Sequence, residues 1–98
     1  MTYLVHIHLA PRDPGSRLPP ECASAIVGHT THPGVVHVVV HPLAEPHPVV
    51  GLYIREPSLV QAEMSARQVW QQAVEAEPWL ENWELVAAEV PLIEIDDA

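Results

Sequence analysis

The sequence predicts an α+β fold in which two helices cover one face of a four-stranded antiparallel sheet. Three observations predict it. Several short segments alternate apolar residues with polar or small ones, which is the period of a half-buried strand. One longer segment, 56–77, places apolar residues three and four positions apart, which is the period of a helix. Clusters of Pro and Gly separate these segments and are typical of turns.

The chain begins with a predicted strand over 2–9. Its residues divide between two faces, with Tyr3, Val5, Ile7 and Leu9 on one and Leu4, His6 and His8 on the other. A turn rich in Pro and Gly follows. Pro20 and Glu21 suit the first turn of a helix and Gly28 suits its end, so a short helix is expected over 20–27.

The next two strands, 35–41 and 49–55, form a predicted hairpin joined by a stiff connection that contains three prolines. In the first of them, one face is expected to carry Val35, His37, Val39 and His41, and the other Val36, Val38 and Val40. In the second, Val50, Leu52 and Ile54 are expected to face the core, with Gly51, Tyr53 and Arg55 on the opposite face.

The second half of the chain gives the long helix 56–77 and a last strand. The buried stripe of the helix is predicted to contain Leu59, Ala62, Ala66, Val69, Ala73 and Ala76, widened by Trp70 and Val74. Pro78 ends the helix. The strand runs over 83–90 with Val86, Ala88 and Val90 inward and Leu85, Ala87 and Glu89 outward, and the tail 92–95 alternates once more.

The predicted order is therefore strand, helix, strand, strand, helix, strand, within a single domain covering 1–98. This is the ferredoxin-like βαββαβ sandwich. If both helices cover the apolar face, the other face of the sheet is bare and carries a mixture of imidazoles and aliphatic side chains. Its expected residues are Leu4, His6, His8, Val35, His37, Val39, His41, Tyr53, Arg55, Leu85, Ala87 and Glu89.

Composition narrows the functional classes. The formal net charge is −9, there is no lysine, and ten of the thirteen acidic residues lie in 56–98. Nucleic acid is not an expected partner, because its binding requires lysine and arginine against phosphates. No apolar run is long enough to cross a membrane, and no signal peptide is seen, so we expect no membrane partner and a cytoplasmic location. The single Cys22 agrees with a reducing compartment.

The bare sheet face is the predicted binding surface. An apolar surface of this kind is typically covered by a partner, and domains of this architecture often pair face to face. We therefore expect a small acidic protein-interaction module that forms a homodimer or binds a partner protein. The residues expected to carry this binding are His6, His8, His37, Val39, His41, Tyr53, Arg55 and Glu89.

Two alternatives stay open at this stage. His6 and His8 stand about 6.6 Å apart on one strand face, near enough to share zinc or another divalent metal. The scaffold also resembles that of small dimeric α+β barrel enzymes of aromatic polyketide metabolism, the cyclases and monooxygenases. That analogy implies a base, His6 or His8, oriented by Glu89, with Tyr53 as a hydrogen-bond donor and Arg55 holding an anionic substrate. No catalytic sequence motif supports it.

Overall fold

A computed structural model describes residues 1–91. Its secondary-structure elements, in chain order, are β1 (Thr2–Pro11), α1 (Glu21–His29), β2 (Val35–His41), β3 (Val49–Arg55), α2 (Leu59–Ala76), the short 3₁₀ helix η1 (Pro78–Asn82) and β4 (Trp83–Glu89). The alternating tail predicted at 92–95 lies outside the described residues.

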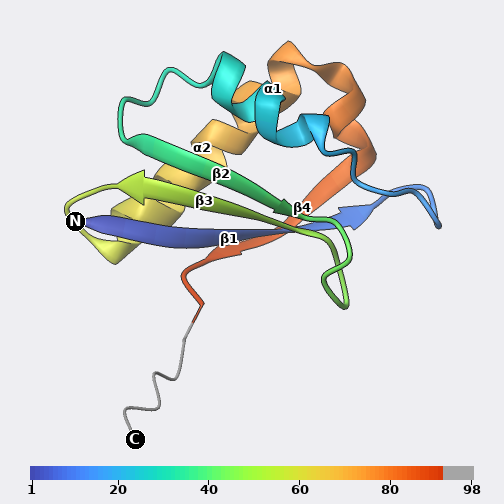
Figure 1. Cartoon of the computed structure of the whole chain (residues 1–98), viewed down its shortest axis with the longest axis horizontal. Helices are drawn as coiled ribbons and strands as arrows, with labels where there is room; N and C mark the ends of the chain where they lie inside the picture. Colours follow the sequence, from blue (N-terminus) through green and yellow to red (C-terminus); the bar gives the residue numbers. More distant parts are fainter. Residues whose placement is uncertain (92–98) are drawn as a thin grey trace, which may run out of the picture.

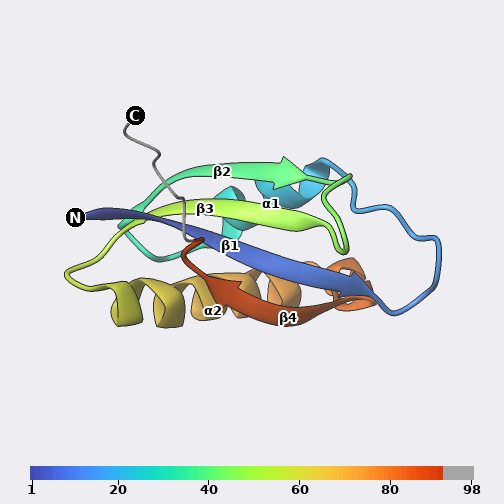
Figure 2. The same ribbon diagram turned by 90° about the horizontal axis from the view of Figure 1, so that it is seen from below.

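The strands form one sheet in the order β2-β3-β1-β4, and every neighbouring pair is antiparallel. Helix α1 packs on β2 and α2, whereas α2 packs on β1, β3 and β4. In Figure 1, α1 and the C-terminal part of α2 lie above the strands, and in Figure 2, seen from below, strands pass in front of α1 and of part of α2. The predicted α+β fold, with a four-stranded antiparallel sheet and two helices, is confirmed. Among residues 1–91, no helix covers the other face of this sheet.

The core lies between the helices and the sheet. Many of its completely buried residues come from alternate positions of β1 and β3 and from the small-residue stripe of α2, as the sequence pattern predicts. They include Val5, Ile7, Leu9, Leu52, Ile54, Ala62, Ala66 and Ala73. Cys22 belongs to this core, and burial raises the pKa of its thiol to about 12.

The helix ends differ slightly from the prediction. Helix α1 continues through Gly28 to His29, because nothing in the backbone at that glycine requires a stop. Helix α2 begins at Leu59 rather than at residue 56, because the Ser58 side chain accepts a hydrogen bond from the Gln61 backbone N–H and so caps the first turn. Within residues 1–91, neither helix has the length and apolar character needed to cross a bilayer.

A β-bulge in β2 changes the predicted sides of its first residues. Val35 pairs with Ile54 and His37 with the next β3 residue, Tyr53, so that Val36 is an extra residue without a partner. Val35 consequently packs against the core, and Val36 is 52% exposed. The predicted placement of Val35 on the bare face and Val36 in the core is therefore wrong.

The same displacement occurs in β4. His8 pairs with Ala87 and the next residue of β1, Leu9, pairs with Leu85, which leaves Val86 as the bulged residue. Leu85 then packs against the core and Val86 is 52% exposed, the reverse of the prediction for both. Beyond the bulge the alternation is as expected, with Ala88 buried and Glu89 exposed.

Candidate functional site

The face of the sheet without helices, called the open face below, carries every residue predicted for binding. The strand register places on this side the predicted residues His6, His8, His37, Val39, His41, Tyr53, Arg55 and Glu89. Leu4, Val49, Gly51 and Ala87 lie on the same side. Val49 is only 6% exposed although it lies outside the helix-side core. The open face is thus partly withdrawn from water before any partner covers it.

Three imidazoles gather at the middle of the open face. The ring centroids of His6 and His8 are 6.2 Å apart, and those of His6 and His41 are 6.3 Å apart, both in edge-on arrangements. His6 and His41 come from β1 and β2, which are separated by β3. The β3 residue in register with His6 is Gly51, which has no side chain to keep the rings apart. We call His6, His8 and His41 the imidazole cluster.

The imidazole cluster disfavours the protonated form of its central member. Burial lowers the pKa of His6 below its ordinary value, and the neighbouring His8 and His41 lower it further by charge repulsion. Glu89 acts in the opposite direction but does not outweigh them. The neutral form of His6 is therefore favoured at the middle of a partly dehydrated surface.

Glu89 lies beside the imidazole cluster, as predicted. Its Oε1 is 3.1 Å from Nε2 of His8, within ion-pair distance. The two groups are not aligned as a hydrogen bond, however, and His8 Nε2 is shielded from solvent without a hydrogen-bond partner. The carboxylate is 59% exposed, so water weakens its attraction for the imidazole. An unpartnered, shielded ring nitrogen is a polar group that a docking partner can satisfy.

The remaining predicted residues lie further along the open face. The rings of His37 and Tyr53 are 5.8 Å apart and form a second aromatic contact. Arg55 is in register with Thr2, whereas His8 is in register with Val49, six residues away along the ladder. This separation corresponds to about 20 Å. The structure therefore brings Glu89 to His8 and leaves Arg55 at the far end of the open face, away from that pair.

The metal-ligating potential of the open face rests on the imidazole cluster and Glu89. In residues 1–91, no three His, Cys, Asp or Glu side chains are arranged as they stand to hold a metal ion. The cluster adds His41 to the predicted pair His6 and His8. Nothing in the alternation of single strands shows that β2 and β1 histidines meet across a glycine.

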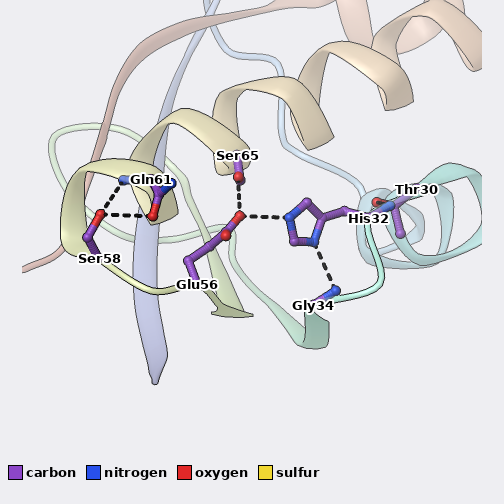
Figure 3. A network of polar contacts seen from close by, with 7 residues as sticks. All are labelled: Thr30, His32, Gly34, Glu56, Ser58, Gln61 and Ser65. Atoms are coloured by element: carbon purple, nitrogen blue, oxygen red, sulfur yellow. Dashed lines mark hydrogen bonds and ion pairs between the residues drawn. The ribbon is translucent and has the colours of Figure 1, made fainter.

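A second polar network, away from the open face, was not predicted from the sequence. His32, in the loop before β2, and Ser65, on α2, both hydrogen bond to Oε2 of Glu56, the His32 contact at 2.7 Å (Figure 3). The Gly34 backbone N–H donates to His32 Nδ1 at 2.9 Å, so the proton of the neutral ring is on Nε2 and is donated to Glu56. The Ser65 bond and then the His32 bond hold the pKa of Glu56 below its ordinary value.

This network has a structural role. Both ring nitrogens of His32 are occupied, and the Ser65 hydroxyl is directed to the carboxylate rather than to the imidazole. The hydroxyl therefore donates to a carboxylate whose lowered pKa makes it a weak base, and not to an imidazole that could activate it as a nucleophile. The contacts instead fasten the loop before β2 to the beginning of α2. Twenty-four residues separate His32 from Glu56, and no sequence spacing signals the pair.

Comparison with protein-family models, with curated proteins and with solved structures finds no match for this chain. The open face is therefore interpreted from its own geometry.

Proposed function

We propose that this chain is a small cytoplasmic protein-interaction module of ferredoxin-like fold that forms a homodimer through the open face. The observation that carries the proposal is that the open face is partly shielded from water although no helix of the described residues packs on it. No helix covers it, yet Val49 is buried, His8 Nε2 is shielded without a hydrogen bond, and the pKa of His6 is lowered by burial. A surface that is already partly dry loses less hydration on docking than an ordinary charged surface.

The chemistry of the open face suits a flat partner. Leu4 and Val39 are half-buried and offer aliphatic contact on either side of Gly51, while the imidazoles both donate and accept hydrogen bonds. Two sheets packed face to face stand about 10 Å apart, which side chains of this size fill. Tyr53, at 37% exposure, is of a residue type enriched in interfaces.

The charges of the open face allow a second copy of the chain as the partner. The open face carries one arginine, Arg55, against two carboxylates, Glu89 and Glu84, the latter in register with Ala10, so two such faces repel each other only weakly. The acidic surplus of the chain belongs to 56–98, and most of it lies on α2, η1 and the residues that follow. Two copies can approach through their sheets while the carboxylates of α2 and η1 remain outside the interface.

The test is the solution mass of a Val39→Glu variant. Burying a carboxylate without a partner in an apolar interface is strongly unfavourable, so the variant should be monomeric at concentrations where the parent is dimeric. The matched control is Val36→Glu on the same strand, because Val36 is 52% exposed and lies in the bulge. Sedimentation equilibrium measures both. A monomeric parent, or a dimer that persists in Val39→Glu, would reject this interface.

A second candidate function is divalent-metal binding by the imidazole cluster. It is favoured by the third imidazole, that of His41, which lies as near to His6 as His8 does. Neutral imidazole nitrogens are good zinc ligands, and Glu89 supplies a neighbouring carboxylate. Calorimetric titration with zinc should show a site that is lost in the double variant His6→Ala, His8→Ala and kept in His37→Ala. Equal binding by the double variant, or no binding by the parent, rejects it.

A further inference from the structure

A cavity of about 510 Å³ lies on the helical side of the molecule, away from the open face. It is formed where α1 meets the segment that joins α2 to η1, and Figure 1 shows α1 beside the C-terminal part of α2. Its apolar wall contains Pro19, Ala25 and Trp79, and its polar groups include Glu21, His29 and Glu77. A volume of this size is in the range of small-molecule sites.

The indole and the carboxylate of this cavity are held in place by each other. Trp79 Nε1 donates to Glu77 Oε2 at 3.2 Å, and His29 Nε2 lies 3.3 Å from Glu77 Oε1. Trp79 is further fixed by an edge-on contact with the buried Trp83, their ring centroids being 6.5 Å apart. The aromatic ring and the negative charge are thus fixed relative to each other before any ligand enters, which lowers the entropy lost on binding.

The charges of the cavity select one kind of ligand. Glu21 and Glu77 are carboxylates, and the described residues that line the cavity include no arginine. A site with an aromatic wall and two carboxylates attracts a positive charge by Coulomb attraction and by the cation–π effect. We propose that this cavity binds a small organic ammonium ion with an apolar or aromatic body. Its nitrogen lies against Glu77, Glu21 at the other end of α1 adds to the negative potential of the cavity, and its body lies against Trp79 and Pro19.

The His29 side chain occupies the position that the ligand would compete for. It contacts the Oε1 atom of Glu77, and it is 41% exposed, so it can swing away into solvent. An incoming ammonium group replaces that contact with a permanent positive charge, which makes a stronger charge-assisted hydrogen bond than a neutral imidazole does. His29→Ala should therefore bind the ligand at least as tightly as the parent protein.

The probe is benzylammonium chloride, with benzyl alcohol as a neutral molecule of nearly the same size. Titration followed by ¹⁵N NMR should show a saturable shift of the Trp79 indole N–H signal, assigned from a Trp79→Phe variant. We expect benzylammonium to bind about tenfold or more tightly than benzyl alcohol, since the ion makes a charge-assisted contact that the alcohol lacks. Equal affinity of the two probes, or no saturable shift with benzylammonium, overturns the proposal.

Variants of the two cavity carboxylates test whether benzylammonium binds in this cavity. Glu21→Gln and Glu77→Gln should each weaken benzylammonium binding several-fold while leaving benzyl alcohol unchanged, because only the charge is removed. The control is Glu75→Gln, an exposed residue of α2 that does not line the cavity. If Glu75→Gln weakens binding as much as Glu77→Gln does, the ion responds to the general acidity of the chain and the proposal fails.

Discussion

The His6 and His41 rings, from strands that are not neighbours in the sheet, lie with their centroids 6.3 Å apart because Gly51 stands between them. An added Cβ at Gly51 would be 3.8 Å from His41 Nε2 and 3.4 Å from Leu4 Cδ1. The glycine thus allows the imidazoles to close over β3, and a larger side chain at this position would occupy the space between them. The imidazole cluster depends on this one small residue as much as on the histidines.

Replacing Gly34 and Gly51 by alanine should have different effects on the free energy of unfolding. At Gly34 an added Cβ would meet the backbone oxygen of Arg55 at 2.6 Å and the His32 ring at 2.8 Å, so Gly34→Ala should cost about 1–3 kcal/mol in the free energy of unfolding. At Gly51 the contacts are ordinary, and Gly51→Ala should change stability by less than about 1 kcal/mol. Urea denaturation measures both.

Gly28→Ala is the control for this pair. Gly28 lies within α1 and an added Cβ there meets nothing within 4 Å, so the variant should be more stable by about 0.5–1 kcal/mol. A loss of stability in Gly28→Ala equal to that of Gly34→Ala would show that the effect comes from glycine removal in general and not from the close approach at Gly34.

The free energy of unfolding should fall as the pH is lowered from about 7 to about 5.5. Burial and the neighbouring imidazoles lower the pKa of His6 in the folded state, so the unfolded chain binds more protons in this range. The stabilisation that comes from neutral His6 is complete above the pKa that this imidazole has in the unfolded chain. It is lost as the pH falls through the lower pKa of His6 in the folded state. Because His6 is partly exposed, the effect should be no more than about 1 kcal/mol.

Denaturation curves of His6→Asn at the two pH values test this assignment. The variant should show a smaller decrease than the parent, whereas His37→Asn, on the same face but outside the imidazole cluster, should keep the parent's decrease. An undiminished decrease in His6→Asn would assign the effect to another group.

Ser65→Ala should raise the pKa of Glu56 towards its ordinary value, because the Ser65 hydrogen bond is the largest cause of the lowering. A carboxyl with a lowered pKa stabilises the fold above its unfolded pKa, and this contribution disappears as the pH falls through the folded pKa. The variant should therefore lose less stability than the parent under acidic conditions. Carbon-13 NMR titration of the Glu56 carboxyl measures the change. Ser58→Ala removes the α2 cap instead and should leave this pKa unaltered.

Homodimerisation should also weaken between about pH 7 and about pH 5.5. In the proposed dimer the imidazole clusters of two chains share one dry layer, where charging them costs desolvation and mutual repulsion. Histidines with pKa values lowered by assembly bind protons more readily as monomers, so acid favours dissociation. Light scattering across this range should show a falling mass. A mass that stays constant or grows at the acid end would place the histidines away from the interface.

The strand and helix pattern of this chain could be predicted because most of its segments obey a simple period. Alternation in β1 correctly predicts that His6 and His8 lie on the open face and that Val5 and Ile7 lie in the core. It fails at Val36 and Val86, where an extra residue in the strand shifts every residue on one side of it. A bulge depends on the register with the neighbouring strand, and alternation within one strand carries no information about that register.

The site was predictable to the same extent. The shared face of the histidines follows from the period of single strands, and the approach of Glu89 to His8 follows from the order of strands. The meeting of His6 with His41 depends on ring positions over a third strand. The joining of His32 to Glu56 depends on how a loop packs on a helix. Neither contact can be predicted from the pattern of apolar and polar residues within one strand or helix.

The two bulges have a consequence for aggregation. Both extra residues, Val36 and Val86, lie in β2 and β4, the strands at the margins of the sheet. A marginal strand as rich in valine as β2 presents unpaired backbone groups that invite further strands to add, as in fibril growth. A bulge interrupts the regular spacing of those groups and twists the strand. The bulges therefore discourage the lateral addition of further strands at both margins of the sheet.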